Sequence, residues 1–96
     1  MYVIEDERHS EHVGQFSTLE LALAELRRLA AIPWDQAPNQ APCTGWATCG
    51  RAYEVIEYDS TSESSRALRR IPALTISSRG VVWAPDVESQ MPPSRA

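Results

Sequence analysis

A single amphipathic segment is the feature that most constrains the fold of this chain. Between residues 18 and 31, apolar residues recur with the spacing of one helical face, so they form a continuous stripe. Ser17 followed by Glu20 matches a capping box at the start, and Pro33 cannot continue the helix at its end. An amphipathic helix must bury its apolar face against another element, and we expect that element to be a sheet. The stripe consists of Leu19, Ala22, Leu23, Leu26, Leu29 and Ala30.

Short strand-like segments lie on both sides of this helix. Residues 2–6 and 13–16 are apolar-rich and flank a polar connection, which predicts a hairpin. Residues 51–59 are rich in Tyr, Val and Ile and predict a further strand. This strand carries acidic residues on both of its faces, and a β-bulge would resolve the conflict.

The segment from residue 65 to the end of the apolar pattern predicts a second hairpin. "SRALRR" suits a helical turn, and "PALTIS" and "VVWAP" then read as paired strands, with Gly80 in the left-handed turn position. Pro72 is expected at a strand start, where a missing amide does least harm. The order is strand, strand, helix, strand, strand, strand. We therefore expect an α+β fold, with a mostly antiparallel sheet of about five strands and one long amphipathic helix packed on one face.

The length of the chain bounds its domain organisation. Ninety-six residues correspond to one domain, which we place at residues 1–86. Residues 87–96 have no apolar period and contain two adjacent prolines, so we expect a disordered C-terminal tail.

Charge and hydropathy exclude several classes of partner. All nine basic residues are arginine, which is typical of a GC-rich bacterial genome, and the net charge of −4 argues against general attraction to nucleic acid. Arg66, Arg69 and Arg70 could form one basic helical face, but acidic residues on both sides weaken its field. No apolar run approaches the roughly 20 residues that span a bilayer, and the N-terminus has no secretory pattern. We expect a cytoplasmic protein with no membrane segment.

The loop at residues 33–50 is the one stretch that suggests chemistry. It exceeds the usual length of a connection, so we expect it to be functional, internally packed, or to contain a short helix. Cys43 and Cys49 flank Trp46 and are separated by five residues, a wider spacing than zinc pairs or thioredoxin-like motifs use. His9 and His12 could supply the other half of a zinc site, but they lie closer together than usual and on another element.

Our interpretation of these residues is therefore conservative. We read the two histidines as a solvated hairpin end, and the cysteines as reduced, metal-free packing residues. No nucleophile elbow and no phosphate-binding glycine loop is present, and nothing in the sequence orients the histidines for catalysis. We read the acidic residues Glu54, Glu57 and Asp59 as a solvated face. The sequence thus predicts no catalytic activity and no cofactor.

The resulting hypothesis is a small non-catalytic domain that binds a protein partner or a second copy of itself. Tryptophan, tyrosine and arginine dominate interface energetics, and the chain has three tryptophans and three tyrosines. The candidate binding residues are Trp46, Arg51, Cys43 and Cys49. The alternative hypothesis is a metal- or thiol-dependent regulatory domain built on the loop at residues 42–51.

Overall fold

The chain forms a five-stranded antiparallel sheet with one long helix, so the predicted α+β fold and its element order are confirmed. The structure, a computed structural model, describes residues 1–45, 47–59 and 66–88. Neither helix within these ranges is long and apolar enough to cross a membrane. The elements are β1 (Tyr2–Asp6), β2 (Glu11–Phe16), α1 (Leu19–Ala30), β3 (Gly50–Asp59), β4 (Arg66–Ser77), β5 (Gly80–Trp83) and α2 (Pro85–Glu88).

The sheet has the strand order β2-β1-β3-β4-β5. Both predicted hairpins are present, as β1–β2 and β4–β5, and Gly80 adopts the expected positive φ of 118°. The central strand β3 pairs with β1 on one side and β4 on the other. It therefore joins the N-terminal and C-terminal hairpins into one sheet, an order that local sequence patterns do not specify.

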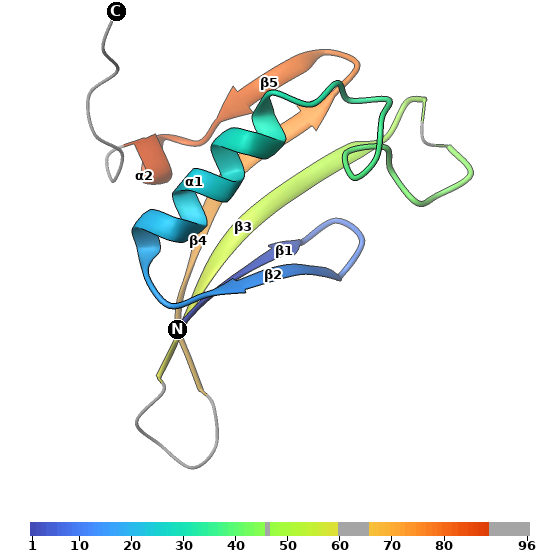
Figure 1. Ribbon diagram of the computed structural model, residues 1–96. Helices are drawn as coiled ribbons and strands as arrows, with labels where there is room; N and C mark the ends of the chain where they lie inside the picture. Colours follow the sequence, from blue (N-terminus) through green and yellow to red (C-terminus); the bar gives the residue numbers. More distant parts are fainter. Residues whose placement is uncertain (46, 60–65, 89–96) are drawn as a thin grey trace, which may run out of the picture.

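Helix α1 lies along one face of this sheet (Figure 1). Ala22, Leu23, Leu26 and Leu29 of the predicted stripe are buried, whereas Leu21 is 52% exposed. The buried helix residues share one apolar cluster with residues from three strands and α2. The strand and α2 members are Ile4, Tyr53, Val55, Ile71, Ala73, Leu74, Ile76 and Val87.

The start of the helix differs from the predicted capping box. Thr18 is the N-cap residue, with extended backbone angles, and its hydroxyl accepts a hydrogen bond from the amide of Leu21 at 3.2 Å. Ser17 therefore precedes the cap, and Glu20 lies one position too early to complete a box. Adjacent Ser and Thr are both competent caps, so sequence alone does not choose between them.

The segment "SRALRR" was predicted as a helical turn, and this is wrong over Arg66–Arg70, which belong to β4. Arg69 donates to Glu57 at 2.7 Å and Arg70 to Glu54 at 2.5 Å, so the basic stretch pairs with the acids of β3. Glu54 is itself buried, in contrast to the predicted solvated face. Cross-strand ion pairs of this kind favour the extended conformation over an isolated helical turn.

Pro72 also lies inside β4 rather than at a strand start. The register between β3 and β4 shifts between Tyr53 and Glu54, and again between Glu57 and Tyr58. Proline is tolerated inside a strand where a bulge interrupts the hydrogen-bond ladder. The extra residues at the two shifts, Ala73 and Leu68, both belong to β4, so β3 itself has no bulge and its register with β1 is regular.

One residue that was assigned to the predicted tail, Val87, belongs to the folded domain. Val87 is fully buried and belongs to the apolar core, because the short helix α2 turns it back onto the sheet. A single apolar residue in a polar stretch gives no periodic signal, which is why the sequence does not reveal it. The remainder of the predicted tail, residues 89–96, lies outside the described residues.

Candidate functional site

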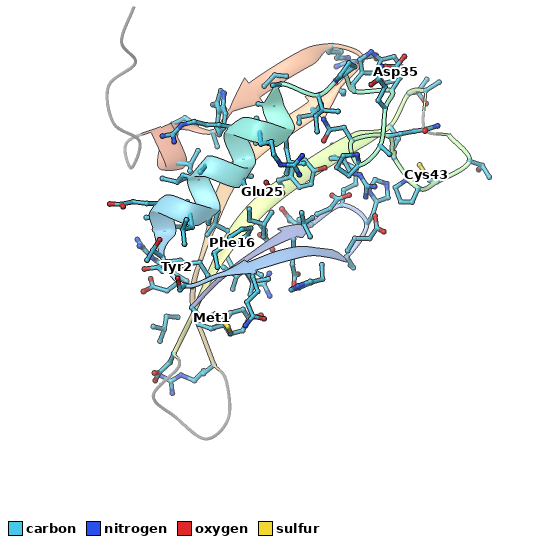
Figure 2. The ribbon with its side chains drawn as sticks, viewed as in Figure 1. Met1, Tyr2, Phe16, Glu25, Asp35 and Cys43 are labelled. Atoms are coloured by element: carbon cyan, nitrogen blue, oxygen red, sulfur yellow. The ribbon has the colours of Figure 1, made fainter. Side chains whose placement is uncertain are left out.

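The loop between α1 and β3 folds back beside the turn of the β1–β2 hairpin (Figure 1). Cys43 of this loop lies at the end of the molecule away from Met1 and Tyr2 (Figure 2). The described part of the loop contains turns and bends but no helix or strand. Its position brings residues from two distant parts of the sequence together.

Asn39 anchors the first half of the loop. Its side chain is 1% exposed, and its amide nitrogen donates to the carbonyls of Leu29 and Ile32, both at 2.8 Å. Its amide oxygen accepts from the Tyr53 hydroxyl at 2.9 Å. The Asn39 side chain therefore connects the loop to the end of α1 through its amide nitrogen and to β3 through its amide oxygen, so that both polar groups of the amide are hydrogen-bonded.

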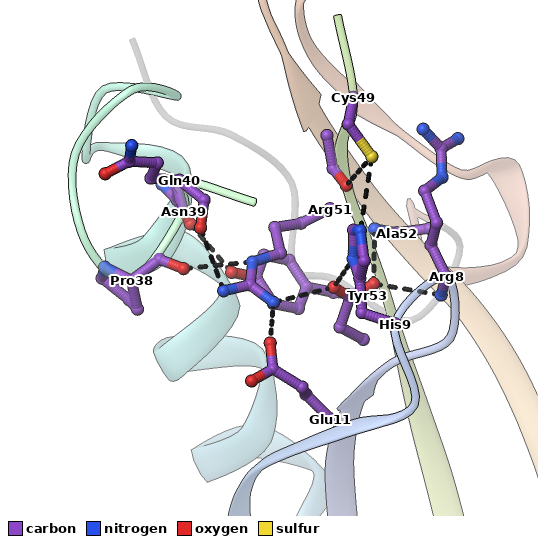
Figure 3. A network of polar contacts seen from close by, with 12 residues as sticks. Arg8, His9, Glu11, Pro38, Asn39, Gln40, Cys49, Arg51, Ala52 and Tyr53 are labelled. Atoms are coloured by element: carbon purple, nitrogen blue, oxygen red, sulfur yellow. Dashed lines mark hydrogen bonds and ion pairs between the residues drawn. The ribbon is translucent and has the colours of Figure 1, made fainter. Parts of the chain in front are cut away.

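Arg51, near the start of β3, ties the same part of the loop to the hairpin (Figure 3). It donates to the carbonyls of Pro38 at 3.2 Å and Gln40 at 3.1 Å, and to the carboxylates of Asp6 at 2.9 Å and Glu11. Its side chain is only 11% exposed. The rigid fork of a guanidinium suits such a hub, because it directs several donors at fixed angles.

Asp6 lies at the centre of this network and is fully buried. Its Oδ1 accepts from the backbone amides of Arg8 and Ala52, both at 3.1 Å. Its Oδ2 accepts from Arg51, and from His9 Nδ1 at 2.5 Å. Burial alone would raise the pKa of Asp6, but the hydrogen bonds from Arg51, His9 and the Ala52 amide outweigh it and lower the pKa. The group is thus held as a carboxylate.

His9 is oriented by this carboxylate. With Nδ1 bonded to Asp6, its other ring nitrogen, Nε2, lies 3.3 Å from Cys49 Sγ (Figure 3). A neutral ring that donates through Nδ1 leaves the Nε2 lone pair directed at the sulfur. The hydrogen bond to Asp6 raises the pKa of His9, with smaller contributions from Cys49.

Cys43 completes the group. Among the described residues, three partly exposed side chains bring one ligand atom each to within 4.8 Å of the other two. They are a ring nitrogen of His9 and the sulfurs of Cys43 and Cys49. Both cysteines are free thiols. The hydrogen bond from Cys43, together with contacts to Gly50, His9 and Arg8, lowers the pKa of Cys49 to about 7 against the opposing effect of burial. The same contact raises the pKa of Cys43.

The reading of both histidines as a solvated hairpin end is wrong for His9. Its side chain is only 12% exposed and is fixed between Asp6 and Cys49. His12 is exposed and does not belong to the group. Sequence reasoning also missed Asp6, to which it assigned no role in a site. The spacing of three residues between Asp6 and His9, across a tight turn, is the signal that could have revealed the pair.

The other candidate binding residues have different outcomes. Arg51 lies beside the group and contacts Asp6, so it supports the site from within the fold. Trp46 lies outside the described residues, so its role as a candidate binding residue stays a prediction. The described part of the loop is anchored by its own Asn39 and by Arg51 of β3.

The donor set fits a tetrahedral metal ion. Zinc binds cysteine sulfur at about 2.3 Å and histidine nitrogen at about 2.0–2.1 Å, so adjacent ligand atoms lie roughly 3.5–3.8 Å apart. The 3.3 Å between Cys49 Sγ and His9 Nε2 is close to that spacing, and Cys43 Sγ lies within 4.8 Å of the others. A metal-binding histidine commonly donates its second nitrogen to a carboxylate, which is the position of Asp6.

Comparison with known proteins adds no further identification. No protein-family model matches the chain, and no curated protein or solved structure matches it significantly. The functional argument therefore rests on the geometry of the site.

Proposed function

We propose that the protein is a metal-dependent regulatory domain that binds one zinc-class divalent ion through His9, Cys43 and Cys49. The observation that carries the proposal is the convergence of these three side chains from two distant segments, with Asp6 fixing the orientation of His9. Such an arrangement needs both the hairpin turn and the long loop in place.

The chemistry of the ligands favours zinc. Two thiolates and one imidazole are a soft-to-borderline set that selects zinc over calcium, magnesium or manganese, which prefer oxygen ligands. Three protein ligands leave a fourth position, which water or a side chain from a partner fills. The partial exposure of all three residues gives such a ligand access.

A regulatory role follows from where the ligands lie. His9 belongs to the turn between β1 and β2, whereas Cys43 and Cys49 belong to the loop before β3. A bound ion would cross-link these two segments through its coordination bonds. Its binding free energy would then add to the stability of the fold. Metal availability would thus set how firmly the loop is held.

A zinc competition titration tests this proposal. The reduced, metal-free chain is titrated with zinc in the presence of a chromogenic chelator, beside Cys43→Ser, Cys49→Ser and His9→Gln. We expect one zinc per wild-type chain, and an affinity at least about tenfold lower in each variant, because each loses one ligand.

His12→Gln is the matched control, since His12 lies on the same hairpin but outside the group. It should bind zinc like the wild-type chain. Equal loss of affinity in the His9 and His12 variants, or no zinc on the wild-type chain, would contradict the proposal.

The interaction-domain hypothesis stays a prediction. Its principal candidate, Trp46, lies outside the described residues. If a partner protein supplied the fourth metal ligand, the chain would be both a metal-binding domain and an interaction domain.

A further inference from the structure

The two cysteines of the site are close to each other as well as to His9. Their sulfurs lie within 4.8 Å, and a disulfide needs about 2.05 Å. Both lie in one loop whose far end is fixed by turn hydrogen bonds from the amides of Thr48 at 3.0 Å and Cys49 at 2.9 Å to the Gly45 carbonyl. Rotation about the Cα–Cβ bonds of the two cysteines moves their sulfurs without moving the backbone, and this is the motion that would close the gap.

We infer that Cys43 and Cys49 form a reversible disulfide on exposure to a peroxide, and that this bond and the metal exclude each other. The inference rests on the proposed metal site, because it uses two of its three ligands. Thiolates bind metal, and oxidation to a disulfide removes both at once. His9 alone then remains, and one imidazole does not retain the ion.

The surroundings of the two sulfurs differ, and this difference assigns their roles. Cys49 Sγ contacts His9 Nε2 at 3.3 Å, and Asp6 holds the ring from its other side. A thiol beside an oriented imidazole is the arrangement of an activated sulfur nucleophile. Cys49 is therefore the sulfur that attacks the oxidant, and Cys43 is the resolving cysteine.

The reaction proceeds in two balanced steps. The Cys49 thiol first gives its proton to His9. The resulting thiolate attacks one oxygen of the peroxide, so that the O–O bond breaks and a sulfenic acid forms on Cys49. The leaving oxygen takes the proton back from His9. The Cys43 sulfur then attacks the Cys49 sulfur, the S–S bond forms, and hydroxide leaves with the Cys43 proton as water. Two thiols and one peroxide thus give one disulfide, one alcohol or water from the leaving oxygen, and one water.

The reverse reaction needs a thiol reductant. Because both cysteines are partly exposed, a dithiol can reach the bond and exchange with it. Reduction restores both thiols and with them the metal ligands. The cluster would then respond to two signals, the metal and the oxidant, through one pair of sulfurs.

The test combines hydrogen peroxide, the zinc-loaded full chain and a chromogenic zinc indicator, with intact-mass analysis of the same samples. We expect the monomer to lose two hydrogen atoms and to release one zinc per disulfide formed. Dithiothreitol should restore zinc binding. Retention of zinc after the disulfide forms, or disulfides between chains only, would overturn the inference.

Single variants test the assignment of roles, and they are compared in the metal-free state so that loss of zinc affinity does not interfere. Cys43→Ser should stop at a sulfenic acid on Cys49. Cys49→Ser should react with peroxide at least about tenfold more slowly, since Cys43 lacks the contact with His9. Equal rates for the two variants would contradict the assignment.

The same experiment separates failure of this inference from failure of the proposed function. A wild-type chain that binds zinc but forms no internal disulfide refutes the inference and leaves the metal site standing. A wild-type chain that binds no zinc refutes the proposed function and, with it, the exclusion between disulfide and metal.

Discussion

At the scale of single residues, the site depends on a carboxylate that does not itself touch the proposed metal. Asp6 is fully buried and gathers donors from His9, Arg51 and two backbone amides. It links the orientation of the ligand His9 to the residue that anchors the loop, Arg51. A change at Asp6 should therefore affect both metal affinity and loop docking.

We predict that Asp6→Asn lowers zinc affinity by about 10–100-fold, the usual effect of losing a partner of a metal-binding histidine. The amide keeps the shape of the side chain but not its charge. Competition titration measures the affinity, and circular dichroism checks that the variant folds. Glu5→Gln, which removes a neighbouring acid outside the network, is the control. Wild-type affinity in a folded Asp6→Asn would show that Asp6 does not orient the ligand.

Tyr53 gives a prediction of pH dependence. Burial raises the pKa of Tyr53 to about 12, and its hydroxyl donates to Asn39. The ordinary value is near 10, so between these two pH values the folded state keeps a proton that the unfolded state releases. This contribution to stability is complete below about pH 10 and is lost as pH rises toward about 12, at up to about 1.4 kcal/mol per pH unit.

Urea unfolding of the wild-type chain and Tyr53→Phe at pH 9 and pH 11 measures this effect. The chain has no lysine, and its titratable groups other than Tyr53 are the same in both proteins, so the comparison with Tyr53→Phe isolates the Tyr53 hydroxyl. We expect the wild-type chain to lose more stability between the two pH values than the variant. Parallel losses would mean that the Tyr53 hydroxyl is not held in its protonated form by the fold.

The residues of the site were only partly predictable from the sequence. Cys43 and Cys49 stood out because cysteine is rare and both lie in a long loop. The spacing of Asp6 and His9 is a local signal for that pair, but the contact of His9 with the cysteines was not predictable, because it depends on how β1 pairs with β3 and where the loop docks. Local spacing rules compare ligands within one segment, whereas this group joins His9 to cysteines that lie 34 and 40 positions away in the sequence.

At the scale of elements, the helix and the two hairpins were predictable because their signals are local. The stripe of α1 and the turn glycine Gly80 each act within a few residues. The conformation of Arg66–Arg70 was not predictable in this way, since their pairing with β3 acids replaces a local helical preference. Val87 likewise becomes part of the core only through the position of α2.

Helix α1 provides a direct test of the core. Leu26 is fully buried in the apolar cluster, whereas Leu21 on the same helix is 52% exposed. We predict that Leu26→Ala lowers the free energy of unfolding by about 2–5 kcal/mol, and that Leu21→Ala changes it by about 0.5 kcal/mol or less. Denaturant unfolding of both variants measures the difference. Similar losses of unfolding free energy in the two variants would contradict the assignment of the Leu26 face as the buried face of the helix.

At the scale of the whole molecule, the strand order β2-β1-β3-β4-β5 places the hairpin turn and the long loop at one end of the sheet. The loop is held there by Asn39 and Arg51, and the proposed ion would add a third connection. This connection would depend on conditions, because metal and oxidant compete for the same sulfurs. Under this proposal, the sheet and helix would form a constant framework, and the loop would be the part that responds to metal and oxidant.

Zinc K-edge X-ray absorption of the loaded, reduced chain tests the central claim most directly, because it reports the atoms around the metal. We expect two sulfur scatterers at about 2.3 Å and nitrogen or oxygen scatterers at about 2.0–2.1 Å, one of them from an imidazole. In His9→Gln the imidazole signature should disappear while both sulfurs remain. A spectrum with no sulfur scatterers, or an imidazole signature unchanged in His9→Gln, would contradict the proposed centre.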